Sequence, residues 1–342
     1  MPREVNQSQT GTYADSFILD DATSAICTLV LYSTVCQLIN VFGIATNIIN
    51  IICFVKQGFK DAINVSLLGL SVSDLCSLIT MVWTCISVTP AFIAADLPFV
   101  SMDVMYLVSG MPHFAFTRVS SCITAVITVE RCVSIVSPLK VKQIITPRRS
   151  SVITVCIFII FTVSATPLFV VNRLGSMLSP LKNKTIVRLT FREDKEQVEK
   201  FTLSINNFCI PLCTFVIIAV STAALSAQLR KNTEWRKRTT NGVLKDRVSS
   251  RNLKVSQMVV TMSTLFIVCF APTTVVLLAM AFVPDMSLNG KYLNATALIG
   301  GFIYTLESIK SSANIFIYNH MSTKYRDTLR SILSATKCSQ NC

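Results

Sequence analysis

Seven apolar stretches divide the sequence, and each is long enough to cross a bilayer as a helix, which requires about 20 residues. They cover residues 27–55, 62–88, 102–136, 151–171, 201–229, 253–283 and 293–319. Only 14% of the residues are charged, against about 25% in soluble domains, and the mean hydropathy is +0.57. The pattern predicts an all-α membrane protein with a seven-transmembrane helix bundle.

Three parts of the chain follow from these stretches. Residues 1–26 are polar and form an extracellular N-terminal tail, and residues 27–320 form the transmembrane domain. In residues 321–333 charged and apolar side chains alternate at helical spacing, which is typical of an interfacial helix. We therefore expect residues 321–342 to form a short amphipathic eighth helix and a cytoplasmic tail.

Basic residues are distributed unevenly between the two sides of the predicted bundle. If the amino terminus is outside, the cytoplasmic segments hold 20 of the 31 Lys and Arg residues and the extracellular segments hold 9. Because Lys and Arg concentrate in cytoplasmic loops, the bias predicts an extracellular amino terminus. It also accounts for the net charge of +13 without a nucleic-acid partner. Three glycosylation triplets fall on the outer side, and they begin at Asn6, Asn183 and Asn294.

The 13 cysteines and two histidines form no CxxC motif and no cluster with metal-ligand spacing. Eleven of the cysteines lie in or beside apolar stretches, where Cys packs as a small hydrophobic residue. No nucleophile–base pattern and no cofactor-binding loop is evident, so we expect neither an enzyme nor a bound metal or cofactor. Cys338 and Cys342 follow the eighth helix, and either palmitoylation or an unmodified tail fits there.

Six short motifs occur in order along the chain. They are Gly43-x3-Asn47, Leu70-Ser-Val-Ser-Asp74, Glu130-Arg131-Cys132, Phe266-x2-Cys269-Phe270-Ala271-Pro272, Asn314-Ile-Phe-Ile-Tyr318 and Tyr325-Arg326-x2-Leu329. Together they resemble the motifs of the rhodopsin-like (class A) G-protein-coupled receptors. The resemblance implies a multi-pass plasma-membrane receptor that binds an extracellular ligand and activates a heterotrimeric G protein.

A narrower resemblance rests on residues 138–149, 233–238 and 307–318, which are similar to chemosensory receptors expanded in gastropod molluscs. It implies a receptor for small environmental chemicals. A neuropeptide receptor is the alternative within the family. A transporter or ion pathway that uses Asp74, Arg118, Glu307 and Lys310 is a further alternative, but the sequence has no internal repeat and no paired helix breaks in two halves.

Several positions depart from the family pattern. Tyr106 occupies the place of the customary third-helix cysteine, and residues 172–200 contain no cysteine, so the usual loop disulfide is not expected. The resemblance also places other residues where the family has Trp in the fourth helix, Tyr in the fifth, Trp in the sixth and Pro in the seventh. These are Ile157, Ala219, Phe270 and Ile315.

The resemblance implies a cytoplasmic switch centred on Arg131. Glu130 would hold Arg131 at rest, and Arg131 would contact the G protein on activation. The simpler interpretation is an arginine that reaches out to water at the membrane edge. Pro272 removes a backbone hydrogen bond and is either a hinge or a passive kink. The switch set also contains Cys132, Phe266, Phe270, Asn314 and Tyr318. The basic segments 140–149 and 230–254 fit an acidic G-protein surface, anionic lipid or topology alone.

Ionisable residues inside the stretches form a predicted polar core. Each costs about 2.5–3.5 kcal/mol on insertion scales and normally faces a partner or a cavity. Glu307 and Lys310 are three residues apart and can pair locally. By resemblance, Asp74 and Ser120 fall where the family often binds sodium. We hypothesise that Lys310 replaces the sodium ion by pairing with Asp74, which leaves Glu307 to face Arg118 or a ligand. Asn47, in the first stretch, is expected to face other helices.

The resemblance also implies a ligand pocket within the bundle. Its lining would be His113, Phe114, Thr117, Arg118, Thr273, Thr274, Leu277 and Tyr304. The absence of Asp at position 113 disfavours an amine ligand of the aminergic type. Arg118 either neutralises a carboxylate-bearing ligand or pairs with Glu307, and His113 serves either packing or recognition.

Overall fold

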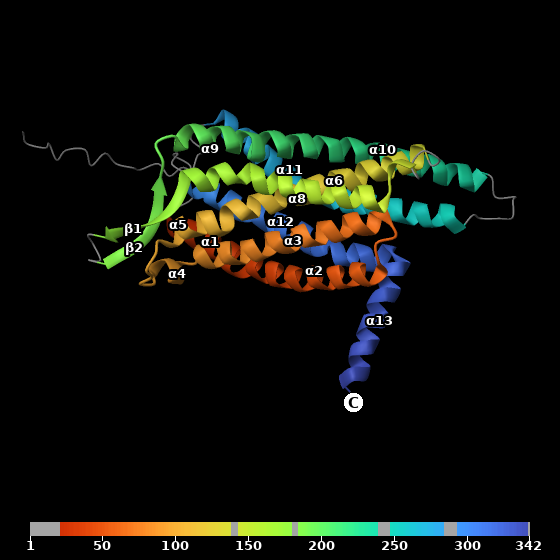
Figure 1. Cartoon of the computed structure of the whole chain (residues 1–342), viewed down its shortest axis with the longest axis horizontal. Coiled ribbons are helices and arrows are strands. Elements are labelled where there is room, and N and C mark those ends of the chain that lie inside the picture. The colour runs from red at the N-terminus through yellow and green to blue at the C-terminus, as the bar shows by residue number, and fades with distance from the viewer. Residues whose placement is uncertain (1–20, 138–142, 180–183, 239–246, 284–292, 341–342) are drawn as a thin grey trace, which may run out of the picture.

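Long helices run side by side along most of the chain in the computed structural model, which describes residues 21–137, 143–179, 184–238, 247–283 and 293–340 (Figure 1). Two of the first three helical runs contain a short π-helical segment, labelled η. The first run is α1 (Asp21–Leu29), η1 (Val30–Cys36) and α2 (Gln37–Gln57), and the second is α3 (Ala62–Ser87). The third run is α5 (Ser101–Met105), η2 (Tyr106–Gly110) and α6 (Met111–Val136).

The remaining runs complete the bundle. The fourth is α8 (Pro147–Val171), and the fifth is α9 (Lys195–Leu203), η3 (Ser204–Cys209) and α10 (Ile210–Arg238). The sixth is α11 (Arg247–Phe282), and the seventh is α12 (Leu293–Met321). These runs match the seven apolar stretches to within about six residues at most ends, so the predicted seven-helix fold is confirmed.

The surface of the bundle is apolar, as a bilayer requires. Six of the runs are long and apolar enough to cross a membrane. In α8, Val152, Val155, Ile159, Ile160 and Val163 are all more than half exposed. Such a stripe faces lipid without cost, since lipid tails are as apolar as these side chains. The seventh run, α12, is less apolar because it carries Glu307 and Lys310.

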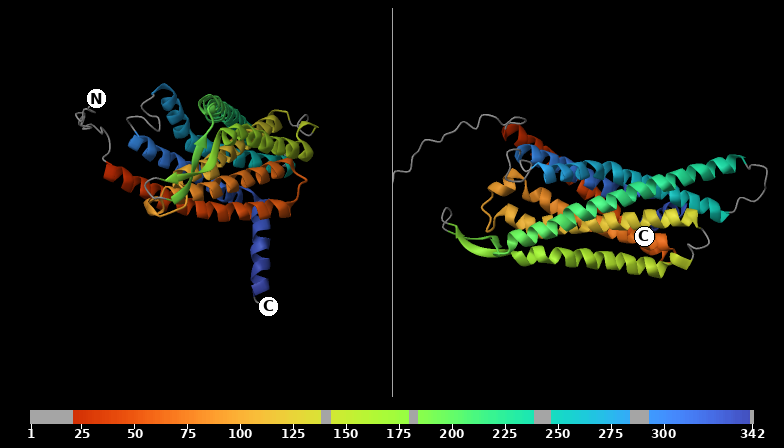
Figure 2. Two further views of the ribbon diagram at one scale, coloured as in Figure 1. Left: turned by 60° about the vertical axis from the view of Figure 1, so that its left-hand side comes forward. Right: turned by 90° about the horizontal axis from the view of Figure 1, so that it is seen from above.

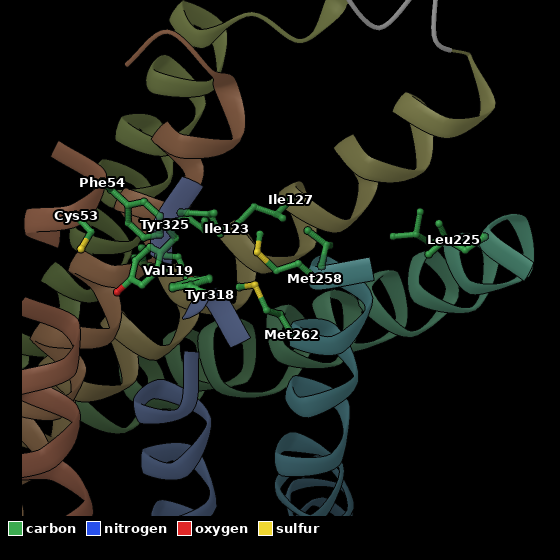
Figure 3. Packing of buried hydrophobic residues seen from close by; sticks show 14 of the residues in the cluster. Cys53, Phe54, Val119, Ile123, Ile127, Leu225, Met258, Met262, Tyr318 and Tyr325 are labelled. Carbon is green, nitrogen blue, oxygen red and sulfur yellow. The ribbon is translucent and has the colours of Figure 1, made fainter. Parts of the chain in front are cut away.

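A cluster of buried hydrophobic side chains packs between the helices of the bundle (Figure 3). The Tyr318 ring lies 5.2 Å from that of Phe54 and 5.5 Å from that of Tyr325, measured between ring centroids. The Tyr325 hydroxyl donates a hydrogen bond of 2.6 Å to Oδ1 of Asn50. These contacts hold the start of α13 (Thr323–Gln340), the predicted eighth helix, against α2 and α12. From there α13 leaves the bundle across its long axis (Figures 1 and 2).

Gly43 allows α2 and α12 to approach closely. The Asn47 amide donates to the backbone oxygens of Gly43 and Ser311, each at 2.9 Å. A Cβ atom on Gly43 would overlap Ser312 and would lie only 2.7 Å from Cδ1 of Leu78. The prediction that Asn47 faces another helix therefore agrees with its position against α12.

A two-stranded hairpin at the opposite end from α13 is the one sheet in the described residues (Figure 1). Strands β1 (Asn172–Ser179) and β2 (Lys184–Phe191) pair antiparallel, in the segment between the fourth and fifth apolar stretches. The backbone of Val187 also bonds to Pro98 and Val100, at 2.8 and 3.0 Å. The hairpin is thereby joined to the segment that follows the short helix α4 (Pro90–Ala94).

Hydrogen bonds tie the hairpin to the third and fifth runs. Oε1 of Glu199 accepts from the Tyr106 hydroxyl at 2.9 Å and from the Asn172 amide at 2.7 Å. Oδ2 of Asp103 accepts from the backbone nitrogen of Leu189 at 3.0 Å. The cysteines whose side chains the structure describes are all free. Tyr106 therefore anchors this end of the molecule through a hydrogen bond.

Candidate functional site

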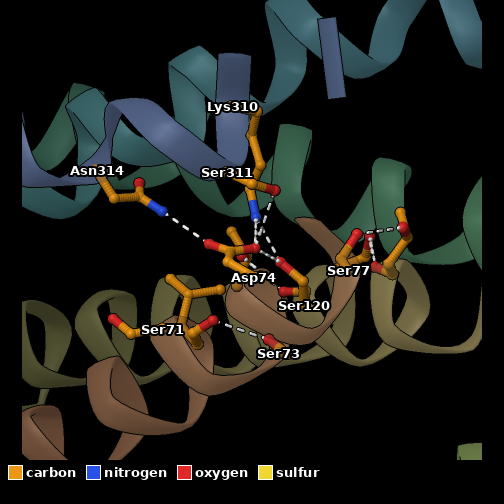
Figure 4. Close-up of polar contacts among 12 residues, drawn as sticks. Ser71, Ser73, Asp74, Ser77, Ser120, Lys310, Ser311 and Asn314 are labelled. Carbon is orange, nitrogen blue, oxygen red and sulfur yellow. Dashed lines mark hydrogen bonds and ion pairs between the residues drawn. The ribbon is translucent and has the colours of Figure 1, made fainter. Parts of the chain in front are cut away.

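A buried network surrounds Asp74, which α3 places at the centre of the bundle (Figure 4). Oδ1 accepts from Lys310 Nζ at 2.9 Å, from the Ser120 hydroxyl at 2.7 Å and from the Ser311 hydroxyl at 3.2 Å. Oδ2 accepts from the Asn314 amide at 2.9 Å. The carboxylate is fully buried, so these donors supply the solvation that water would give it.

Lys310 reaches this network from α12. Its side chain is 4% exposed, and Nζ donates to Ser120 as well as to Asp74. Nζ also lies 5.9 Å from the centre of the Phe266 ring. Of the two partners considered for Lys310, Asp74 is the one it contacts. No ion pair with Glu307 occurs among the described residues.

Glu307 lies in a second polar cluster. Its Oε2 is 3.3 Å from His113 Nε2. The other ring nitrogen of His113 lies 3.2 Å from the Ser77 hydroxyl, which in turn lies 3.2 Å from the Thr117 hydroxyl. The Tyr304 ring packs on the imidazole at 5.6 Å between centroids. Glu307 therefore faces His113, and no ion pair between Glu307 and Arg118 occurs within the part of the chain that the structure describes.

Arg118 lies in a pocket between α6, α8 and the start of the fifth run. It is 3% exposed, and its Nε and Nη1 atoms have no hydrogen-bond partner within the part of the chain that the structure describes. Residues from those helices line the pocket with it, namely Met111, Phe114, Ala115, Phe161, Ser164, Ala165, Leu168, Leu203, Asn206 and Asn207.

The structure divides the predicted ligand-pocket set. Phe114 and Arg118 line the pocket, whereas His113, Thr117 and Tyr304 belong to the Glu307 cluster. On α11, Thr273 is buried, Leu277 is half-buried, and the Thr274 hydroxyl donates to the backbone oxygen of Phe270 at 3.0 Å. The pocket around Arg118 is therefore lined by the third, fourth and fifth runs, and these α11 residues lie elsewhere.

At the cytoplasmic end predicted from the charge bias, Glu130 and Arg131 do not face each other. Oε1 of Glu130 accepts from the Ser150 hydroxyl of α8 at 3.1 Å, and the described residues show no Glu130–Arg131 ion pair. Adjacent helical residues point about 100° apart, so neighbours in sequence are not neighbours on the helix surface. That Glu130 holds Arg131 at rest therefore stays a prediction. Arg131 Nε is buried without a hydrogen-bond partner among the described residues.

The other residues of the predicted switch set lie within the packed bundle. The Phe266 and Phe270 rings stack at 4.3 Å between centroids, and both are buried. Pro272 lies inside α11 without ending it. The Cys132 thiol contacts the backbone oxygen of Ser221 in α10 at 3.0 Å. The sixth run therefore stays continuous through its proline.

Some predicted residues cannot be placed. Asn6, Asn183, Lys140, Lys142 and Cys342 lie outside the described residues, and the side chain of Cys338 is likewise not described. Asn294, predicted to lie in a loop, falls in the first turn of α12.

Sequence reasoning missed Ser77 and Ser311. Ser77 lies three residues after Asp74, and Ser311 lies three residues before Asn314. Residues three apart share a helix face, so this spacing could have drawn both into the predicted polar network.

Comparison with known protein families gives one result that covers most of the chain. The family described as 7 transmembrane receptor (rhodopsin family) matches residues 45–318. A search of curated proteins gives no match.

Proposed function

The chain belongs to the rhodopsin family of seven-transmembrane receptors, and on that premise we propose that it is a chemosensory receptor coupled to a heterotrimeric G protein. Membership makes it a multi-pass membrane protein of the receptor class, not an enzyme. In the proposal the amino terminus is extracellular and a small molecule enters the bundle from outside. Arg131 and the basic segments 140–149 and 230–254 meet the G protein.

The observation that carries the coupling proposal is the unpartnered Nε atom of Arg131. Its Nε is buried without a hydrogen-bond partner in the described residues, while Glu130 bonds to Ser150. Buried polar groups are costly when unpaired. A helix of the G protein that inserts at this end would supply the missing acceptor, for example a backbone carbonyl.

In this proposal the sixth run, α11, is the helix that moves on activation. Pro272 removes one backbone hydrogen bond from α11 and weakens the helix at that turn. The stacked rings of Phe266 and Phe270 lie within the two turns before it. A ligand that shifts the outer part of α11 would change this stack, and the inner part of the helix would swing away from α6.

A neuropeptide receptor is the second candidate. The hairpin β1–β2 favours it, because the bonds of Val187, Asp103 and Glu199 give that end an ordered platform without a disulfide. A transporter is less well supported. Asp74 and Glu307 each have a partner in separate clusters, and the sequence has no inverted repeat.

A ligand screen separates these candidates. Cells that carry the chain with a promiscuous G protein are exposed to mixtures of small organic compounds and to mixtures of short amidated peptides. Calcium release is recorded, with untransfected cells as the control. We expect responses to small organic compounds. Responses to peptides alone would favour the neuropeptide receptor, and uptake of a labelled compound without signalling would favour a transporter. Transcripts confined to tissue without sensory cells would contradict the chemosensory role.

A further inference from the structure

We propose that the pocket around Arg118 binds small organic anions, with the guanidinium of Arg118 as the partner of a ligand carboxylate. This inference rests on the proposed receptor function and narrows its ligand class. It starts from an imbalance of charge. Only 3% of Arg118 is exposed. Because an arginine side chain stays protonated in proteins, Arg118 carries a buried positive charge.

No described side chain neutralises Arg118 directly. Its Nε and Nη1 atoms lack hydrogen-bond partners, and within the described residues no carboxylate forms an ion pair with it. The nearest candidate, Glu307, is engaged by His113 at 3.3 Å. A buried, unpaired charge is costly, so the site as it stands favours an incoming anion.

The pocket supplies a second polar group for such a ligand. Asn206 is used internally, because it exchanges hydrogen bonds with Ser164 at 3.0 and 3.4 Å and donates to Thr202. Asn207 also lines the pocket, and no hydrogen bond of its side chain occurs among the described residues. Its amide is therefore available to donate to the same carboxylate.

The rest of the lining defines the body of the ligand. Phe114, Phe161, Leu168 and Leu203 line the pocket with apolar surface. The guanidinium donates two parallel hydrogen bonds to a carboxylate in the favoured geometry. The enclosed space is only about 20 Å³, so the chemistry selects a small monocarboxylate with a short aliphatic body, and it discriminates against the matching amide, which carries no charge.

Thermal unfolding of the purified full-length protein tests the site. The probes are formate, acetate, propionate and butyrate, each compared with its own amide. We expect at least one acid to raise the melting temperature of the unmodified protein while its amide does not. Arg118→Gln should weaken the binding of that acid by at least about tenfold, since hydrogen bonds to charged groups contribute about 1.5–3 kcal/mol. Asn207→Ala should weaken its binding less.

The unliganded variants separate this inference from a structural role. Because Arg118 is unpaired, Arg118→Gln should melt at or above the temperature of the unmodified protein, whereas His113→Ala should melt below it. A lower melting temperature for Arg118→Gln, an acid effect that survives this substitution, or no effect of any acid would overturn the proposal. Signalling by an active acid that is unchanged in Arg118→Gln would also overturn it and would leave the receptor function standing.

Discussion

Nζ of Lys310 lies 2.9 Å from Oδ1 of Asp74, and the two side chains are 4% and 0% exposed. The pair joins α12 to α3, and Ser120 completes it from α6 by donating to Asp74 and accepting from Lys310. In a family whose members often hold sodium near the residue equivalent to Asp74, this chain has a covalently attached cation in contact with that carboxylate. We propose that Lys310 takes the place of the ion.

Loss of the Lys310 ammonium is the first test. Lys310→Ala leaves the Asp74 carboxylate buried without its counter-charge, and breaking a buried pair in this way costs about 3–5 kcal/mol. We expect a marked fall in the melting temperature of the purified protein. We also expect sodium chloride to raise the melting temperature of this variant above its value in choline chloride, because the vacated position can accept the ion.

Two comparisons control that experiment. The unmodified protein should melt at the same temperature in both salts. Lys324→Ala removes the half-exposed ion pair in which Lys324 Nζ lies 3.1 Å from Oδ2 of Asp61. This substitution should lower the free energy of unfolding by less than about 1 kcal/mol. Sodium stabilisation of the unmodified protein that disappears in Lys310→Ala would show that Lys310 does not replace the ion.

The packing of α2 against α12 and α3 gives a second prediction. Gly43→Ala places a Cβ atom on Ser312 and 2.7 Å from Leu78, and overpacking of this kind costs about 1–3 kcal/mol. Gly300→Ala is the matched control, because its Cβ would meet only the Tyr32 hydroxyl, at 3.4 Å. Thermal unfolding should show a clearly lower melting temperature for Gly43→Ala and little change in melting temperature for Gly300→Ala. Equal melting temperatures for the two variants would mean that the helices do not approach as described.

The hairpin anchor gives a third prediction. Tyr106→Phe removes the 2.9 Å bond to Glu199, and a hydrogen bond of this kind contributes about 1 kcal/mol. Hydrogen exchange should become faster in residues 172–191. Glu199→Ala should have a larger effect because it also removes the bond to Asn172, whereas Glu199→Gln keeps an acceptor oxygen. Unchanged exchange in Tyr106→Phe would remove Tyr106 from the anchor.

The positions of the helices could be predicted because the bilayer requires long apolar stretches. The second stretch was predicted at residues 62–88, and α3 covers Ala62–Ser87. The hairpin was missed because residues 172–200 are hydrophilic overall. However, β2 contains Thr185, Ile186 and Val187 in succession, and such β-branched residues favour strands.

The partners of the buried charges were harder to predict. Residue spacing gives the face of a helix but not how far the helix is rotated against its neighbours. Lys310 could be assigned to Asp74 because the resemblance placed both at one site. Glu307 turned out to face His113, a contact between α12 and α6 that depends on their relative rotation. The resemblance linked Glu130 with Arg131, whereas Glu130 bonds to Ser150 of α8, a contact that depends on how α6 and α8 are rotated against each other.

Nucleotide exchange on a purified heterotrimeric G protein tests most directly whether this chain signals through Arg131. Membranes containing the unmodified chain or Arg131→Ala, matched for surface amount, are stimulated with the compound mixture that is active in the calcium screen. Arg330→Ala, an exposed arginine on α13, is the control. We expect the unmodified chain and Arg330→Ala to accelerate exchange. The acceleration by Arg131→Ala should be at least about tenfold lower, as expected when a hydrogen bond to a charged group is lost. Exchange by Arg131→Ala at the rate of the unmodified chain would contradict the coupling role of Arg131.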